Sequence, residues 1–133
     1  MNKIFTFIAA VFALASCSTS KQIEPINLVG KWAIVNAMGM STEGCERQAF
    51  IEFNDEGRMN GNATVNNFFG SYVLKADHLS FSNIGTTMMM GPTMDIEQSI
   101  TKVLDGSVTV RAKGDSLYFL NSDKETIMTL KKE

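Results

Sequence analysis

The strongest hydrophobic pattern near the start of the chain is an almost unbroken apolar run from Ile4 to Leu14, which follows Lys3. A basic residue, a short apolar run and then small residues are typical of a secretory signal peptide. The run is too short to remain in a bilayer as a spanning helix, which needs about 20 residues. The pattern therefore predicts that residues 1–16 are a signal peptide.

The residues at the cleavage position, Leu14-Ala15-Ser16-Cys17, resemble a bacterial lipobox. In proteins with this motif the cysteine becomes the first residue and carries acyl chains such as palmitate. The motif predicts Cys17 as the lipidation site and the membrane as a partner through that anchor. Ser18 and the lack of a neighbouring acidic run favour the periplasmic face of an outer membrane. The alternative is an ordinary secreted protein that happens to have cysteine here.

The polar residues 17–27, with Pro25, are expected to form a flexible tether, followed by one domain over residues 28–133. Short β patterns dominate this domain. In residues 49–54, for example, Ile51 and Phe53 alternate with Phe50 and Glu52. Tight polar connections between such segments favour antiparallel pairing. Strands are expected at 28–36, 49–54, 71–75, 79–82, 107–112, 116–120 and 126–131.

One segment has helical instead of alternating periodicity. Ile96, Ile100, Val103 and Leu104 lie on one face of a helix. Acidic residues stand in its first turn, where the helix dipole favours negative charge, and Gly106 follows its end. The predicted fold is therefore α+β: a curved antiparallel β-sheet or partly closed small barrel with one amphipathic helix. Twelve side chains are expected in its core: Trp32, Ile34, Ile51, Phe53, Tyr72, Leu74, Phe81, Ile100, Leu104, Val108, Leu117 and Phe119.

Composition adds little about chemistry. Without the signal peptide the chain has 11 basic and 14 acidic residues, so its net charge is −3, and no basic run indicates nucleic-acid binding. With Cys17 committed to lipid, Cys45 has no partner within the chain. It is either buried and inert or a free thiol, and a buried or half-buried position is favoured.

Three motifs in order resemble the META domain, also called the HslJ-like domain. They are Leu28-Val29-Gly30-Lys31-Trp32, the segment Gly61 to Tyr72, and the segment Gly85 to Pro92 with Glu97 after it. The match spans about residues 28–131. The resemblance implies an α+β fold with a curved antiparallel sheet and one helix. It also implies a loose link to stress responses and no catalytic residues that can be carried over.

The chain departs from this family at two positions. Many members carry cysteine where this chain has Val65 and, in our alignment, Gly91. The joint loss suggests a pair that is linked in relatives and dispensable here, and it leaves Cys45 outside the family pattern.

Methionines form the most unusual cluster of potential ligands. Thioethers are soft ligands that suit Cu(I), whereas methionine more commonly fills irregular gaps in cores and loop surfaces. The copper candidates, from two loops, are Met38, Met40, Met88, Met89, Met90 and Met94. A shared site requires the first loop to approach the second.

The remaining candidates favour structure over chemistry. His78 is the only histidine and is expected to be exposed in a turn. A zinc site usually needs three or four protein ligands, and this chain does not supply the usual set. No nucleophile motif or phosphate-binding loop occurs, so no catalytic residue, tight metal or cofactor is expected. The scattered carboxylates are expected to be solvated: Glu43, Glu46, Glu52 and Glu56. The polar cluster Asn66, Asn67, Gly70 and Tyr72 is expected to shape a turn or bulge, or alternatively to line a ligand groove.

Two short motifs match modification acceptors. Asp115-Ser116-Leu117 resembles an O-glycosylation acceptor of some Gram-negative phyla, and Asn62-Ala63-Thr64 matches the N-glycosylation pattern, which a bacterial lipoprotein is not expected to use.

Taken together, the sequence predicts a non-enzymatic envelope lipoprotein, a stress-related accessory or binding module. The alternatives are a small-barrel inhibitor or ligand binder that acts on a specific envelope partner, and a Met-rich Cu(I)-binding protein.

Overall fold

The computed structural model describes residues 25–133. The predicted signal peptide, Cys17 and most of the predicted tether lie outside these residues. Within the described part of the chain, no helix is both long enough and apolar enough to span a membrane.

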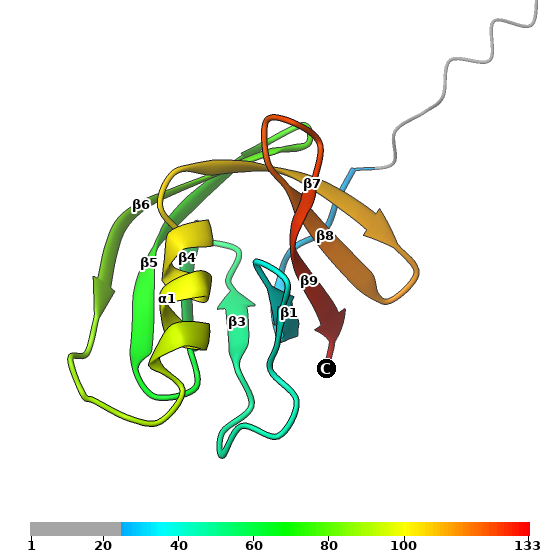
Figure 1. Ribbon diagram of the computed structural model, residues 1–133. Helices are drawn as coiled ribbons and strands as arrows, with labels where there is room; N and C mark the ends of the chain where they lie inside the picture. The colour runs from blue at the N-terminus through cyan, green and yellow to red at the C-terminus, as the bar shows by residue number, and fades with distance from the viewer. Residues whose placement is uncertain (1–24) are drawn as a thin grey trace, which may run out of the picture.

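Eight antiparallel strands form a closed barrel, and a ninth, short strand pairs with the end of the first (Figure 1). The barrel order is β1, β3, β4, β5, β6, β7, β8 and β9, and β9 pairs back onto β1. Closure pairs β9 with β1, so neither of these two strands is left as the exposed edge of an open sheet. The strands are β1 (Gly30–Ala37), β2 (Met40–Ser41), β3 (Phe50–Phe53), β4 (Arg58–Asn62), β5 (Asn67–Lys75), β6 (His78–Thr86), β7 (Ser107–Lys113), β8 (Ser116–Leu120) and β9 (Thr126–Lys132).

The barrel interior is the hydrophobic core. Along β3, Ile51 and Phe53 are buried while Glu52 is exposed, as the alternating pattern predicts. Ten of the twelve predicted core side chains are buried, and the other two, Tyr72 and Leu74, are half-buried and pack against the core.

The helix α1 (Met94–Val103) lies against β1, β2 and β9. Its apolar face is directed inward, with Ile100, Val103 and the following Leu104 buried. The predicted orientation of the helix is therefore confirmed, as is the fold class of a small barrel with one helix.

Two strands were not predicted from the sequence. Strand β4 contains one large apolar residue, Met59. Its Gly61 and two asparagines are residue types that occur rarely in strands. Pairing with β3 on one side and β5 on the other holds it extended. The short β2 pairs only with the end of β1. Strands β5 and β6 are longer than predicted, because a register shift near Gly70 lets the two remain paired across an irregular segment.

Candidate functional site

The pairing between β6 and β7 covers only a short part of β6. The ladder runs from His78 opposite Thr109 to Ser80 opposite Ser107, and the Phe81 amide then donates to the Gly106 carbonyl at 3.0 Å. Beyond this point β6 continues to Thr86 with β5 as its one strand partner among the described residues. Among the described residues, the second half of β6 therefore has no strand partner on the side where β7 pairs with its first half.

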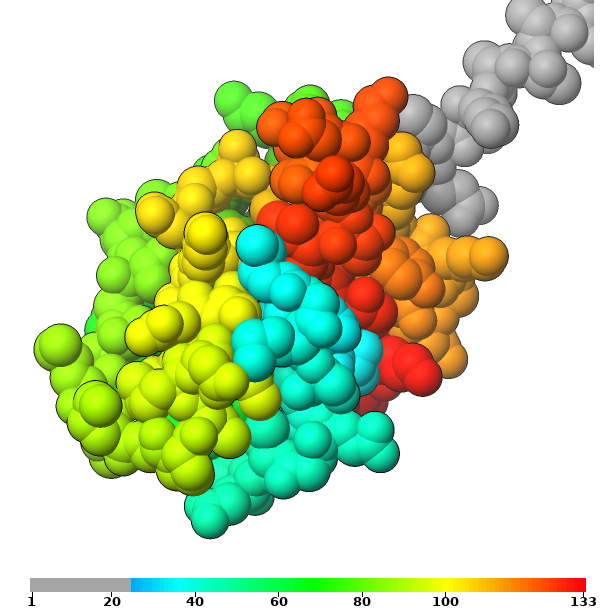
Figure 2. Space-filling model, in the orientation of Figure 1, coloured from blue at the N-terminus to red at the C-terminus, as the bar shows by residue number. Residues whose placement is uncertain are grey.

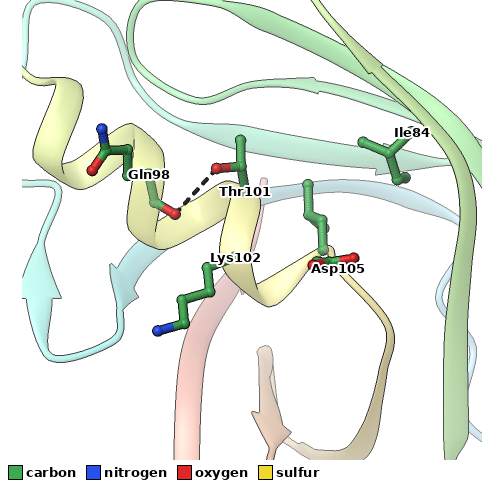
Figure 3. Close-up of a pocket in the computed structure, with 6 residues that line it drawn as sticks. Ile84, Gln98, Thr101, Lys102 and Asp105 are labelled. Carbon is green, nitrogen blue, oxygen red and sulfur yellow. Dashed lines mark hydrogen bonds between the residues drawn. The ribbon is translucent and has the colours of Figure 1, made fainter.

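A hollow of about 450 Å³ lies between this half of β6 and the helix α1 (Figure 3). Ile84 lines it from β6, and Thr101 and Lys102 line it from α1, with Asp105 just beyond the helix. Figure 3 shows the Thr101 hydroxyl donating to the Gln98 carbonyl, a bond of 3.1 Å. The wall of this hollow is thus part helix and part strand.

A second hollow of about 230 Å³ adjoins the first, because Gln98 and Thr101 line both. Its other walls come from Asn66 just before β5, from the end of β6, from the loop between β6 and α1, and from the start of α1. The two hollows together form the α1 recess. The second hollow is lined by Asn66, Thr86, Thr87, Met88, Met89, Met90, Met94, Glu97, Gln98 and Thr101.

A buried hydrogen-bond network forms the floor of the second hollow. Glu97 is only 5% exposed, and its carboxylate accepts the Asn66 backbone N–H at 3.1 Å and the Asn66 side-chain amide. Asn66 also forms two hydrogen bonds with the loop that follows β6. Its Nδ2 donates to the Met89 carbonyl at 2.8 Å, and its Oδ1 accepts a bond from the Met89 amide at 2.7 Å. The Thr87 hydroxyl donates to the same Oδ1 at 2.8 Å. The buried carboxylate is thus satisfied by hydrogen bonds, as burial of a charge requires.

The predicted cluster of Asn66, Asn67, Gly70 and Tyr72 has a largely structural role. Gly70 lies at the register shift between β5 and β6, and Asn67 accepts a bond from Asn62 at 2.9 Å. The Tyr72 hydroxyl donates to the Asn54 carbonyl, and burial, followed by the charge of Asp55, raises the pKa of Tyr72. Asn66 is the exception, because it both holds the loop and lines the recess.

The methionines of the loop are not core residues. Met88 is 93% exposed and Met90 is 86% exposed, on either side of the half-exposed Met89. Figure 2 shows the loop region, in yellow-green, at the margin of the molecule beside the yellow helix α1. Gap filling therefore does not explain Met88 and Met90.

The structure does not bring the two predicted methionine loops together in this recess. Met38 and Met40 line neither of its hollows. The sulfur of Met40 instead lies 3.4 Å from the Ser99 hydroxyl of α1.

Other candidate residues lie away from the recess. His78 is exposed at the start of β6, 3.8 Å from the Asp77 carboxylate, as predicted for a turn histidine. Cys45 is half-buried, as expected, and has no disulfide partner in residues 25–133. Ser116 of the possible glycosylation motif is half-buried within β8, and its modification stays a prediction. The four scattered carboxylates are exposed: Glu43, Glu46, Glu52 and Glu56. No group of three or more His, Cys, Asp or Glu side chains suited to a metal occurs in residues 25–133.

Val65 and Gly91, the two positions at which family members were expected to carry cysteine, are in contact. A Cβ atom on Gly91 would lie 3.5 Å from the Cβ of Val65 and 2.6 Å from one of its methyl carbons. The contact joins the loop between β4 and β5 to the loop that carries the methionines. The hydroxyls of Thr64 and Thr93, 2.6 Å apart, tie the same two loops together.

Comparisons with known proteins agree with this fold. The family model of the META domain matches residues 26–133. One similar structure, solved by NMR, is 19% identical and covers 79% of this chain and 90% of its own, with a TM-score of 0.64. An NMR structure of a protein from Burkholderia xenovorans is 22% identical, covers 83% and 90%, and has a TM-score of 0.60. A DUF4847 family protein from Bacteroides vulgatus is 13% identical, covers 81% and 95%, and has a TM-score of 0.59. No curated protein matches the chain.

Proposed function

We propose that this chain, which belongs to the META domain family, is a non-enzymatic binding module that is anchored at the bacterial cell envelope through lipid on Cys17 and binds its ligand in the α1 recess. The observation that carries this proposal is the recess itself, two adjoining hollows at the one place where β6 leaves its neighbour β7. Concave sites with a mainly apolar lining and a few placed polar groups are where proteins bind small ligands.

The bonding of the polar groups supports binding rather than catalysis. Asn66, Thr87 and Glu97 hydrogen-bond to one another and to the loop backbone. A general acid or base must reach the proton that it transfers, whereas these side chains are engaged in holding the recess in shape. A stress-related role is part of the proposal and rests on the family resemblance alone.

Native mass spectrometry of the full chain, extracted in detergent from its own envelope, tests the proposal and reports the mass of the ligand. The wild-type chain should carry a bound species. Thr101→Trp places a large side chain where the two hollows meet and should remove that species, while the exposed Arg111→Trp on β7 should leave it in place. A chain without any bound species, or one whose bound species survives Thr101→Trp in a folded variant, would refute the proposal.

A second candidate function is inhibition of a specific envelope protein through the barrel surface. Phe69 and Val73, both half-exposed, lie on the outer side of β5 and favour this alternative. If Phe69→Ser with Val73→Ser abolishes the bound species and Thr101→Trp does not, the barrel surface is the binding site.

The anchor makes a separate prediction. Cys17→Ser removes the thiol that carries the acyl chain, so the variant should move from the membrane fraction to the soluble periplasmic fraction. Metabolic labelling with a palmitate analogue and immunoblotting of the fractions measure the two effects. A Cys17→Ser chain that still sediments wholly with membranes would show that the lipoprotein interpretation is wrong.

A further inference from the structure

We propose that the second hollow of the α1 recess is a Cu(I) site, in which the thioethers of Met88, Met89, Met90 and Met94 bind a single ion. This inference rests on the proposed function, because it names the ligand class for the same recess.

The four methionines reach one hollow from two directions. Met88, Met89 and Met90 come from the loop after β6, and Met94 is the first residue of α1. The hollow, of about 230 Å³, has room for an ion and for the ends of several side chains. Each side chain is unbranched with three rotatable bonds and can turn its sulfur toward a shared centre.

The exposure of Met88 and Met90 leaves their sulfur atoms accessible to a ligand. Met88 and Met90 are 93% and 86% exposed, so neither gains the burial that normally stabilises an apolar side chain. A thioether keeps a lone pair available to a soft cation only when the sulfur is accessible. The exposed side chains of Met88 and Met90 gain little from packing, but their sulfur atoms are accessible to a metal ion.

The hydrogen-bond network holds the middle of the ligand loop. Asn66 bonds both the amide and the carbonyl of Met89, at 2.7 and 2.8 Å. Fixing the backbone of Met89 limits the freedom of Met88 and Met90 on either side of it. A ligand loop that is already ordered loses less conformational entropy when it binds.

The chemistry of the lining selects the ion. Neutral sulfur ligands favour Cu(I) over the hard cations that prefer oxygen. Glu97 is the one ionisable side chain among the residues that line this hollow, and its buried carboxylate supplies negative charge near a monovalent cation. Its oxygens accept bonds from Asn66, so Glu97 acts through its charge and leaves coordination to sulfur.

The test is an anaerobic titration of the full chain in detergent with Cu(I), in competition with a chromogenic Cu(I) chelator. Cys45→Ser serves as the background, because a free thiol also binds Cu(I). We expect one tightly bound ion per chain. Replacing the four methionines with leucine keeps their size and removes the sulfur, and should abolish tight binding. The matched control, Met38→Leu with Met40→Leu, should leave the affinity unchanged within the error of the titration.

Titration with Ag(I), a diamagnetic ion of the same charge, gives a second readout that does not depend on the chelator. The methyl NMR signals of Met88, Met89, Met90 and Met94 should shift together at one equivalent, while that of Met38 should not. Circular dichroism checks that the leucine variant is folded.

Weak binding of several ions per chain, or tight binding that a folded leucine variant retains, would overturn the copper site. If that occurs while native mass spectrometry finds a ligand sensitive to Thr101→Trp, the copper inference fails and the binding function stands. Absence of both signals would remove both proposals.

Discussion

Replacing Glu97 with alanine should lower the free energy of unfolding by about 2–4 kcal/mol, because it leaves two buried donors of Asn66 without their charged acceptor. The loss of stability should extend to the loop whose Met89 backbone is hydrogen-bonded to Asn66. The amides of residues 87–91 should therefore exchange faster with solvent than in the wild type. Urea unfolding measures the first effect and hydrogen exchange measures the second.

Asp95→Ala is the matched control. Asp95 stands in the same first turn of α1 but is exposed, and it accepts one bond from the neighbouring Ile96 amide at 2.9 Å. Asp95→Ala should lower the free energy of unfolding by less than about 1 kcal/mol, because an exposed carboxylate near a helix N-terminus contributes no more than that. Equal costs for the two variants would show that the buried network contributes little to stability.

Cysteines introduced together at positions 65 and 91 should form a disulfide and raise the free energy of unfolding by about 3 kcal/mol. The Cβ separation of 3.5 Å falls within the range of disulfides, and Cys in place of Val65 removes the methyl group that a Gly91 side chain would otherwise meet. The disulfide would close the chain between positions 65 and 91 into a loop. The conformational entropy that this removes from the unfolded chain corresponds to about 3 kcal/mol.

The double variant is best made in a Cys45→Ser background, so that any disulfide within residues 25–133 must join the new pair. Comparing the oxidised protein with its reduced form isolates the effect of the bond from that of the substitutions. Two free thiols in the oxidised protein, or an oxidised form no more stable than the reduced one, would contradict the predicted proximity.

The fold could be predicted from sequence where local patterns agree with the tertiary structure. Alternation around Ile51 and Phe53 gives β3, and the spacing from Ile96 to Leu104 gives α1 and its buried face. Strand β4 could not be predicted, because its Gly61 and asparagines oppose a strand locally and only pairing with two neighbours keeps it extended.

The site was only partly predictable for a similar reason. The sequence identifies the methionines and the Asn66 segment as unusual. It places Glu97 in the first turn of a helix. A carboxylate there interacts favourably with the helix dipole whether it is exposed or buried, so the position does not predict that Glu97 is buried. Its burial depends on Asn66, 31 residues earlier in the chain, and no local pattern encodes that pairing. The contact between Val65 and Gly91 was suggested by the family resemblance, and the structure confirms that they are adjacent.

The central claim, that the α1 recess holds a ligand in the envelope, is tested most directly by methionine alkylation. The chain is treated briefly with iodoacetamide either in its own envelope or after purification without ligand, and the sulfonium product at each methionine is measured by mass spectrometry. Met88 and Met90 are the most exposed of the recess methionines, and Met38, outside the recess, serves as the reference. The account predicts that Met88 and Met90 are alkylated more slowly in the envelope while Met38 is alkylated at the same rate in both samples. Equal rates for Met88 and Met90 in the two samples would contradict it.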